Sequence, residues 1–122
     1  MIYEYKATII DIYDADTMTL EIDLGFNIKI TEKVRLYGID TPELRTKNKQ
    51  EKKLGYEARD YLRNLLLDKD VTIQTIKDKK GKFGRYLVVV YYEGDNINNH
   101  LIDLGYAKDY FGGTKEKWFK GS

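Results

Sequence analysis

The sequence predicts one α+β domain that is mainly β, a five-stranded OB-fold barrel with two helices. Three consecutive segments have the character of β-strands, one helical segment and two further strand segments follow, and a short capped helix comes last. This order of elements is that of the OB fold. With 122 residues, of which 42% are hydrophobic, the chain can bury an apolar core without disulfides.

The first three strands are predicted from composition and alternation. Residues 6–13 (KATIIDIY) are rich in β-branched side chains. Residues 17–24 alternate between polar and apolar side chains, which predicts a second strand with one buried face. That face consists of Met18, Leu20, Ile22 and Leu24. Residues 27–37 predict a third strand, in which Val34 and Leu36 point inward.

A loop and a helix are expected next. Residues 41–53 are dense in Lys, Asn and Gln and show no periodicity, which predicts a mobile loop. Apolar side chains then recur at helical spacing, with Arg59 and Arg63 on the exposed side. These apolar residues are Leu54, Ala58, Tyr61, Leu62 and Leu65. We expect this helix to end near Asp68.

The second half completes the barrel. Residues 71–77 and 85–92 predict the fourth and fifth strands, joined by a basic turn at residues 79–84. Asn96 can cap a short helix, which Gly105 is placed to end in a left-handed conformation. The inward residues of this helix are predicted to be Ile97, Leu101 and Leu104.

Composition excludes several classes of protein. No apolar run is long enough to span a bilayer, so we expect no membrane segment. Separately, we expect the protein to be a monomer. The absence of Cys excludes disulfides and thiolate metal sites. The first residues do not have the pattern of a signal peptide. Localisation stays open between a phage-encoded protein made in the host cytoplasm and a secreted protein whose signal has been removed.

Charge is unevenly distributed, although the net charge is only +1. Residues 1–43 contain 4 basic and 9 acidic side chains, whereas residues 44–92 contain 13 basic and 6 acidic ones. An acidic block beside a basic block is typical of a cation site next to a phosphate-binding surface. An ordinary solvated surface can show the same pattern, so charge alone does not decide between them.

Three short motifs combine acidic and basic residues. They are residues 14–17 (DADT) between the first two strands, residues 34–43 (VRLYGIDTPE) at the end of the third strand, and residues 81–85 (GKFGR) before the fifth. A phosphodiester is an anion, and its hydrolysis requires neutralisation of charge as the transition state forms. Arg35 and Arg85 suit this role because a guanidinium can hold two phosphate oxygens at once.

The carboxylates of the same motifs complete a hydrolytic set. Asp16 and Asp40 offer the oxygen ligands of a hard cation, which adds Lewis-acid stabilisation. Glu43 can accept a proton from the attacking water. Each motif also has a structural explanation, because short Asp-rich segments form turns, an arginine in a strand often pairs with a carboxylate, and lysines often cover a hairpin tip. Only the combination favours chemistry.

The order and spacing of D-x-D-T, V-R-L-x-G-I-D-T-P-E and, some forty residues later, F-G-R-Y resemble the staphylococcal nuclease family. The resemblance covers about residues 6–111 and includes residues 55–58 (GYEA) and 104–108 (LGYAK). It implies an SNase-like nuclease domain at residues 1–111 and a C-terminal tail at residues 112–122.

The resemblance implies a calcium-dependent endo- and exonuclease that hydrolyses DNA and RNA. Water would attack phosphorus in line, expel the 5′ oxygen and leave a 3′-phosphate. Calcium would be bound by Asp16, Asp40 and the backbone carbonyl of Thr41. Arg35 and Arg85 would hold the scissile phosphate.

The remaining roles also follow from the resemblance. Glu43 would act as the general base. Lys82 and Phe83 fall where the family contacts a terminal phosphate and a base, and Tyr110 or Phe111 falls near its nucleotide-stacking tyrosines. The flat face of Phe83 among lysines favours single strands or AT-rich duplex.

The chain departs from the family pattern at three places. Ala15 replaces the usual Gly of the first motif, which requires ordinary backbone angles there. The type member of the family has a third long helix after the barrel, and in this sequence we expect Trp118 with Phe119 to dock in its place as an apolar anchor. His100, the only histidine, is predicted to be structural or exposed.

Two other functions compete with nuclease activity. One is a non-catalytic SNase-like module that only binds nucleic acid, and the presence of all five charged site residues argues against it. The other is a calcium-regulated interaction domain, which leaves both arginines unexplained.

Overall fold

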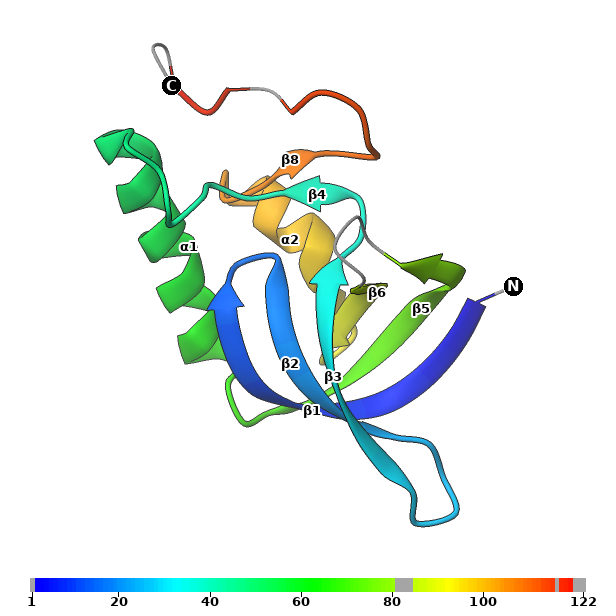
Figure 1. The fold of residues 1–122 in the computed structure, drawn as a ribbon. Helices are drawn as coiled ribbons and strands as arrows, with labels where there is room; N and C mark the ends of the chain where they lie inside the picture. Colours follow the sequence, from blue (N-terminus) through cyan, green and yellow to red (C-terminus); the bar gives the residue numbers. More distant parts are fainter. Residues whose placement is uncertain (1, 81–84, 116, 120–122) are drawn as a thin grey trace.

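The computed structural model describes residues 2–80, 85–115 and 117–119, and its centre is a closed barrel (Figure 1). Its five strands are β1 (Ile2–Asp14), β2 (Thr17–Asp23), β3 (Lys29–Leu36), β5 (Asp70–Lys80) and β6 (Tyr86–Tyr92). Neighbours pair in the order β3-β2-β1-β5-β6, and parallel pairing of β3 with β6 closes the barrel. The predicted five-stranded barrel is confirmed.

Three strands of two residues each were not predicted. β7 (Asp95–Asn96) extends the sheet beside β6. β4 (Ile39–Asp40) pairs with β8 (Lys108–Asp109), so the segment after β3 lies against the segment after the second helix. Elements this short have no periodicity in the sequence, and only the folded chain reveals them.

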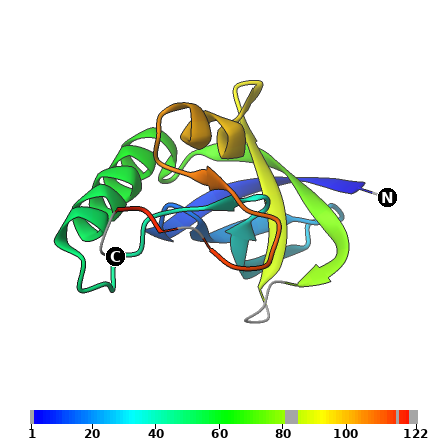
Figure 2. The ribbon, with the colours of Figure 1, turned by 90° about the horizontal axis from the view of Figure 1, so that it is seen from above.

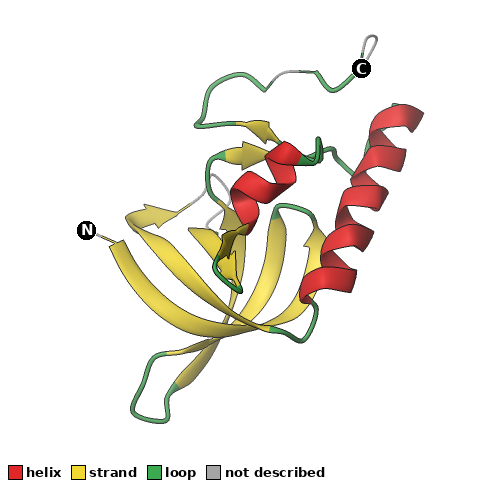
Figure 3. Ribbon diagram, turned by 180° about the vertical axis from the view of Figure 1, so that it is seen from behind, coloured by secondary structure: helices red, strands yellow, loops and turns green. Residues whose placement is uncertain are grey.

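Helix α1 (Lys49–Leu66) begins within the predicted loop of residues 41–53, so that loop prediction was wrong from Lys49 onward. Asn48 caps the helix, because its side chain accepts a hydrogen bond from the backbone N–H of Glu51 at 2.9 Å. The helix ends two residues before Asp68, which has a positive φ of 64°. Figure 3 shows α1 lying alongside the strands.

Other boundaries differ by smaller amounts. β1 begins at Ile2, earlier than predicted, and β5 runs through Lys80 into the predicted basic turn. The rest of that turn, residues 81–84, lies outside the described residues. Helix α2 (Ile97–Asp103) has the predicted cap at Asn96.

Two predicted core residues are exposed. Leu104 is 44% exposed because α2 ends one residue earlier, and the predicted left-handed Gly105 follows with a φ of 81°. Leu24 is 39% exposed because β2 ends at Asp23 and Leu24 belongs to the hairpin beyond the barrel.

The apolar core joins the barrel to both helices. Ile9, Met18 and Leu36 of the strands are fully buried with Leu62 of α1 and Leu101 of α2. No helix among the described residues is long and apolar enough to cross a membrane.

Arg63 corrects the prediction that its side chain lies on the exposed face of α1. It is half-buried and donates hydrogen bonds from Nε (3.0 Å) and Nη2 (2.9 Å) to the carbonyl oxygen of Ile12. These two hydrogen bonds from a charged donor connect α1 to β1, close to Asp14 at the end of the strand.

Asn98 of α2 connects three segments from the interior. Its Oδ1 accepts from Val90 N at 3.1 Å, and its Nδ2 donates to Tyr37 O at 2.9 Å and to Val88 O at 3.1 Å. The residue is buried, so no water can replace these bonds. Asn98 therefore fixes the chain after β3, which leads to Asp40.

We expect Asn98→Ala to lower the free energy of unfolding by roughly 2–4 kcal/mol, because Val90 N and Tyr37 O lose the hydrogen bonds that Asn98 supplies. Urea denaturation measures this change. The neighbouring Asn99→Ala is the control, since Asn99 is exposed, and it should change stability by less than about 0.5 kcal/mol. Equal stability of the two variants would contradict the role of Asn98.

Candidate active site

The candidate site lies where β2 begins and β3 ends. In this antiparallel pair Thr17 is the partner of Arg35, and the backbone N–H of Leu36 donates to the carbonyl of Asp16 at 2.9 Å. Ala15 has no positive φ, as its side chain requires, and it is buried under this turn. The strand register thus places the first acidic motif directly against Arg35.

Arg35 lies between two nearly buried carboxylates. Its Nη2 is 3.4 Å from Oδ2 of Asp16 and 4.0 Å from Oδ1 of Asp40, and it donates to the carbonyl of Ile39 at 3.3 Å. Asp16 and Asp40 are each only 6% exposed. Two buried like charges need a cation to be stable, and Arg35 supplies one. β4 and its partner β8 hold Asp40 in this place.

The first motif holds one protonated and one ionised carboxyl. Burial, a side-chain hydrogen bond with Asp16 and the charge of Asp16 raise the pKa of Asp14 to about 8. Burial also opposes ionisation of Asp16, but the hydrogen bond from Asp14 and the charge of Arg35 outweigh it, and the pKa of Asp16 lies below its ordinary value. Hydroxyls of Thr17 and Thr41 add hydrogen bonds to Asp16. Asp16 therefore stays ionised at neutral pH.

A pocket of about 200 Å³ opens over these groups. It brings together all five charged residues that the sequence predicted for the site. Its lining consists of Tyr13, Asp14, Asp16, Thr17, Arg35, Asp40, Thr41, Glu43, Leu44, Arg45, Arg85 and Lys115. Arg85 reaches the same turn from the chain before β6, and its Nη1 donates to Oγ1 of Thr17 at 3.2 Å.

The donor set suits a hard cation that keeps several waters. Among the described residues, no three His, Cys, Asp or Glu side chains gather as a metal centre. The two carboxylates of Asp16 and Asp40 nevertheless share one guanidinium, and an ammonium, that of Lys115, lies 3.1 Å from Oδ1 of Asp40. Both carboxylates therefore contact protein cations in this structure, and their oxygens are of the type that hard cations prefer.

Glu43 lines the pocket with an exposed side chain, and its backbone is held by helix α1. The carboxylate of Glu51 accepts a hydrogen bond from Glu43 N at 2.9 Å. The sequence analysis missed Glu51, although Asn48 and Glu51 form the N-x-x-E pattern of a capping box, which could have revealed both the helix start and this residue.

Two residues of the tail also reach the site and were not predicted there. They are Lys115, already placed beside Asp40, and Trp118, whose Nε1 donates to Oδ2 of Asp40 at 3.4 Å. Trp118 was expected only as an apolar anchor, yet its indole N–H contacts the carboxylate of Asp40. The tail has no periodicity, so no sequence signal indicated either contact.

The predicted substrate-binding residues have different outcomes. Lys82 and Phe83 lie outside the described residues. The ring of Tyr110 lies 6.0 Å from Cζ of Arg35 and 5.5 Å from Nζ of Lys115, so Tyr110 borders the site. Phe111 is largely exposed, packs edge-on against Tyr37 and is not among the residues that line the pocket.

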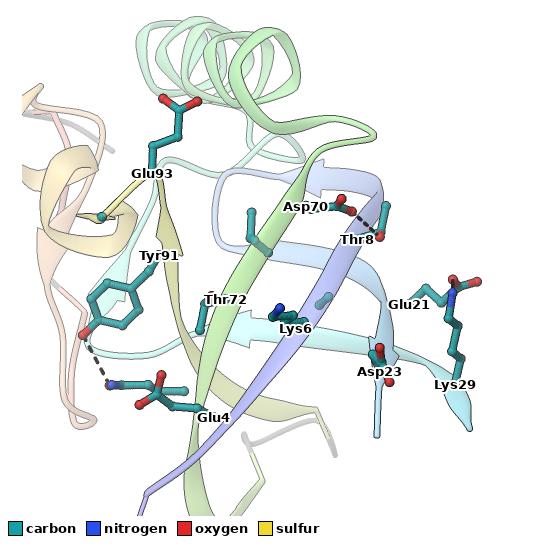
Figure 4. A pocket seen from close by; sticks show the side chains of 14 residues that line it. Glu4, Lys6, Thr8, Glu21, Asp23, Lys29, Asp70, Thr72, Tyr91 and Glu93 are labelled. Carbon is teal, nitrogen blue, oxygen red and sulfur yellow. Dashed lines mark hydrogen bonds and ion pairs between the residues drawn. The ribbon is translucent and has the colours of Figure 1, made fainter. Parts of the chain in front are cut away.

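A larger pocket, of about 780 Å³, lies elsewhere (Figure 4). It is lined from β1, β2, β3, β5 and β6. It includes Lys6 and Asp23, which are register partners at the opposite end of the β1–β2 ladder from Asp14 and Thr17. It contains none of the motif residues. Size alone therefore does not locate the chemistry of this chain, and the smaller pocket holds the convergent charged groups. The half-buried His100 also lies away from the site, where its Nε2 is 2.6 Å from the hydroxyl of Tyr61.

Comparison with known proteins relates the chain to a family of nucleases. A sequence model of the family described as staphylococcal nuclease homologue matches residues 33–120. The endonuclease YhcR of Bacillus subtilis is 32% identical, over 88% of this chain and 9% of that protein. The thermonuclease of Staphylococcus hyicus is 28% identical, over 88% of this chain and 61% of its own length.

A further relative, an uncharacterized protein of Methanocaldococcus jannaschii, is 29% identical over 87% of this chain and 59% of its own length. The chain thus spans at most about three fifths of these relatives. The family match nevertheless covers most of the chain, from the second half of β3 through both helices, β5 and β6. The chain belongs to the staphylococcal nuclease homologue family.

Proposed function

We propose that this chain is a calcium-dependent nuclease. It hydrolyses phosphodiester bonds of DNA and RNA by in-line attack of water and leaves 3′-phosphate ends. The observation that supports this most is the convergence of two carboxylates, two arginines and Glu43 on one pocket of about 200 Å³. Relatives named thermonuclease and endonuclease support the same reaction class.

Arg35 and Arg85 neutralise the scissile phosphate in this proposal. Both guanidiniums are anchored at the same turn, Arg35 by Asp16 and Arg85 by Thr17. A preorganised cation needs no rearrangement as negative charge builds on phosphorus, and it is worth more in a partly buried pocket than in water. Bound by Asp16, Asp40 and the backbone carbonyl of Thr41, calcium supplies Lewis-acid stabilisation.

Glu43 takes the proton of the attacking water. Its side chain is exposed in the pocket, and solvent can reach it. The raised pKa of Asp14 makes that residue a poor base at neutral pH, because it already carries a proton. Glu43, whose exposed carboxylate lines the pocket, accepts the proton in this proposal.

The substrate strand passes along a basic surface in this proposal. Exposed lysines gather where α1 begins, next to the pocket wall formed by Glu43 and Arg45. They are Lys47, Lys49, Lys52 and Lys53. Phosphate contacts of this kind do not depend on base sequence, so the protein can act on both DNA and RNA. In this proposal it acts as a monomer. Single strands or AT-rich duplex reach the pocket most easily.

We expect cleavage of a single-stranded oligonucleotide in calcium, little cleavage in magnesium and none in excess chelator, because the site offers few protein ligands and keeps waters. Products should carry 5′-hydroxyls, which a kinase labels without phosphatase treatment. Gel analysis of labelled products measures the extent of cleavage under each condition and the chemistry of the 5′ ends. Full activity in chelator, or products with 5′-phosphates, would overturn the mechanism, and calcium-dependent binding without cleavage would indicate a non-catalytic module.

We expect Arg35→Lys, Arg85→Lys and Glu43→Gln each to lower kcat by on the order of 10²-fold, since each removes an interaction of the transition state. The lysine variants keep the charge that balances the acidic pair, so the fold should survive. Arg59→Lys is the control, because Arg59 lies on α1 and contacts Tyr56 and Asp60 instead. A lysine variant with the wild-type rate would show that the bidentate phosphate contact is wrongly assigned.

A further inference from the structure

Helix α1 holds the backbone of Glu43 by two contacts. The carboxylate of Glu51, a buried residue, accepts from Glu43 N at 2.9 Å. One turn later, Gly55 lets the helix approach, because a Cβ at that position would lie 2.8 Å from the carbonyl oxygen of Pro42 and 3.2 Å from that of Glu43. The backbone before and after the Glu43 side chain is thus fixed against one face of α1.

The helix start leaves the Glu51 carboxylate available for this contact. In an ordinary capping box the acidic residue at this position bonds to the N–H of the capping residue. Here Oγ1 of Thr46 accepts from Asn48 N at 3.2 Å, and Asn48 in turn accepts from Glu51 N at 2.9 Å. Glu51 therefore spans from the first turn of α1 to Glu43, eight residues earlier in the chain.

We propose that Glu51 is a positioning residue for Glu43, a role that rests on the proposed nuclease function. Glu51 does not line the pocket and touches no reacting atom. Its hydrogen bond sets where the Glu43 carboxylate meets the water, and a small misplacement of such a group is costly to the rate. Arg35 and Arg85, which hold the scissile phosphate in the proposed reaction, lie on the barrel, so loss of the Glu51 contact should affect kcat more than KM.

The test compares Glu51→Ala with Glu51→Gln in the calcium-loaded protein. We expect the Ala variant to lower kcat about tenfold or more with KM changed less than about threefold. The Gln variant should keep most of the rate, because its amide oxygen can accept the same bond. Glu57→Ala, an exposed position on the same helix, is the control and should match the wild type.

A double variant separates positioning from a general loss of structure. If Glu51 acts through Glu43, then Glu51→Ala added to Glu43→Gln should lower kcat little further. An equal loss in both backgrounds, or a Glu51→Ala variant with the wild-type kcat, would overturn the proposal. Wild-type kcat in Glu43→Gln itself would instead show that Glu43 is not the base, and both proposals would fail together.

A separate observation concerns Asp40, whose carboxylate oxygens both contact the tail. Lys115 Nζ lies 3.1 Å from Oδ1, and the indole of Trp118 donates to Oδ2 at 3.4 Å. Lys108 is the β8 partner of Asp40. Its ammonium donates to the carbonyl of Lys117 at 2.8 Å and lies 4.7 Å from the Trp118 ring, so it holds the tail beside Asp40. Figure 2 shows the tail crossing the end of the barrel at β4 and β8.

We infer that Lys115 competes with the divalent cation for Asp40. The inference takes the identity of the cation, calcium, from the proposed function. An ammonium beside a carboxylate oxygen repels a second cation at the same oxygen, so calcium must displace Lys115 when it binds. Trp118 contacts the other oxygen of the same carboxylate, so its fluorescence can report occupancy of the metal site.

Calorimetric titration with calcium in the absence of nucleic acid tests this inference. Lys115→Gln should tighten calcium binding about two- to fivefold, the range expected for a partly exposed ion pair. Lys117→Gln is the matched control, because Lys117 contacts Lys108 through its backbone carbonyl, and its affinity should equal that of the wild type. Trp118, the only tryptophan, should change its fluorescence as calcium binds.

Unchanged or weaker calcium binding in Lys115→Gln would overturn the competition. Wild type and Lys115→Gln that both bind no calcium would overturn the calcium site itself, along with the competition. If Lys115→Gln binds calcium more tightly than the wild type but neither protein cleaves nucleic acid, the competition between Lys115 and calcium is supported and only the nuclease reaction is refuted.

Discussion

The contact between Arg35 and the two buried carboxylates, Asp16 and Asp40, is the interaction on which the site depends. Two carboxylates this close and this deeply buried repel each other, and each loses hydration. The guanidinium compensates both costs because the β2–β3 register and the parallel β3–β6 pairing hold Arg35 at the junction. Closure of the barrel therefore does more than form a core, since it sets the charge balance of the pocket.

The remaining groups follow from the same balance of charge. Asp14 keeps its proton beside the ionised Asp16, which avoids a third negative charge. Lys115 adds positive charge at Asp40 from outside the barrel, where a metal ion would act in the same sense. Glu43 lies on a segment whose backbone is bonded to α1, and in the proposed reaction its carboxylate would take a proton while Asp16 and Asp40 would bind the cation. Different elements thus position the carboxylates of one pocket, which allows the separate roles that we propose for them.

Much of the barrel was predictable because its strands alternate or are β-branched, as residues 17–23 show, and α2 was predictable because Asn96 and Gly105 mark its ends. The start of α1 was missed because lysines obscured the signal of Asn48 and Glu51. The convergence of Asp16, Arg35 and Arg85 on one pocket agrees with the sequence motifs. The contacts of Lys115 and Trp118 depend on two-residue strands and an aperiodic tail, and no local pattern encodes them.

The most direct measurement is a crystal structure of the protein soaked with calcium, with the ion located by anomalous diffraction. We expect one ion with oxygen ligands from Asp16, Asp40 and the carbonyl of Thr41, at the 2.3–2.6 Å typical of calcium. Arg35 should then turn from the carboxylates toward the open pocket, and Lys115 should leave Asp40. A calcium ion bound only in the larger pocket around Lys6 and Asp23, with Arg35 and Lys115 still on the acidic pair, would contradict the site as a whole.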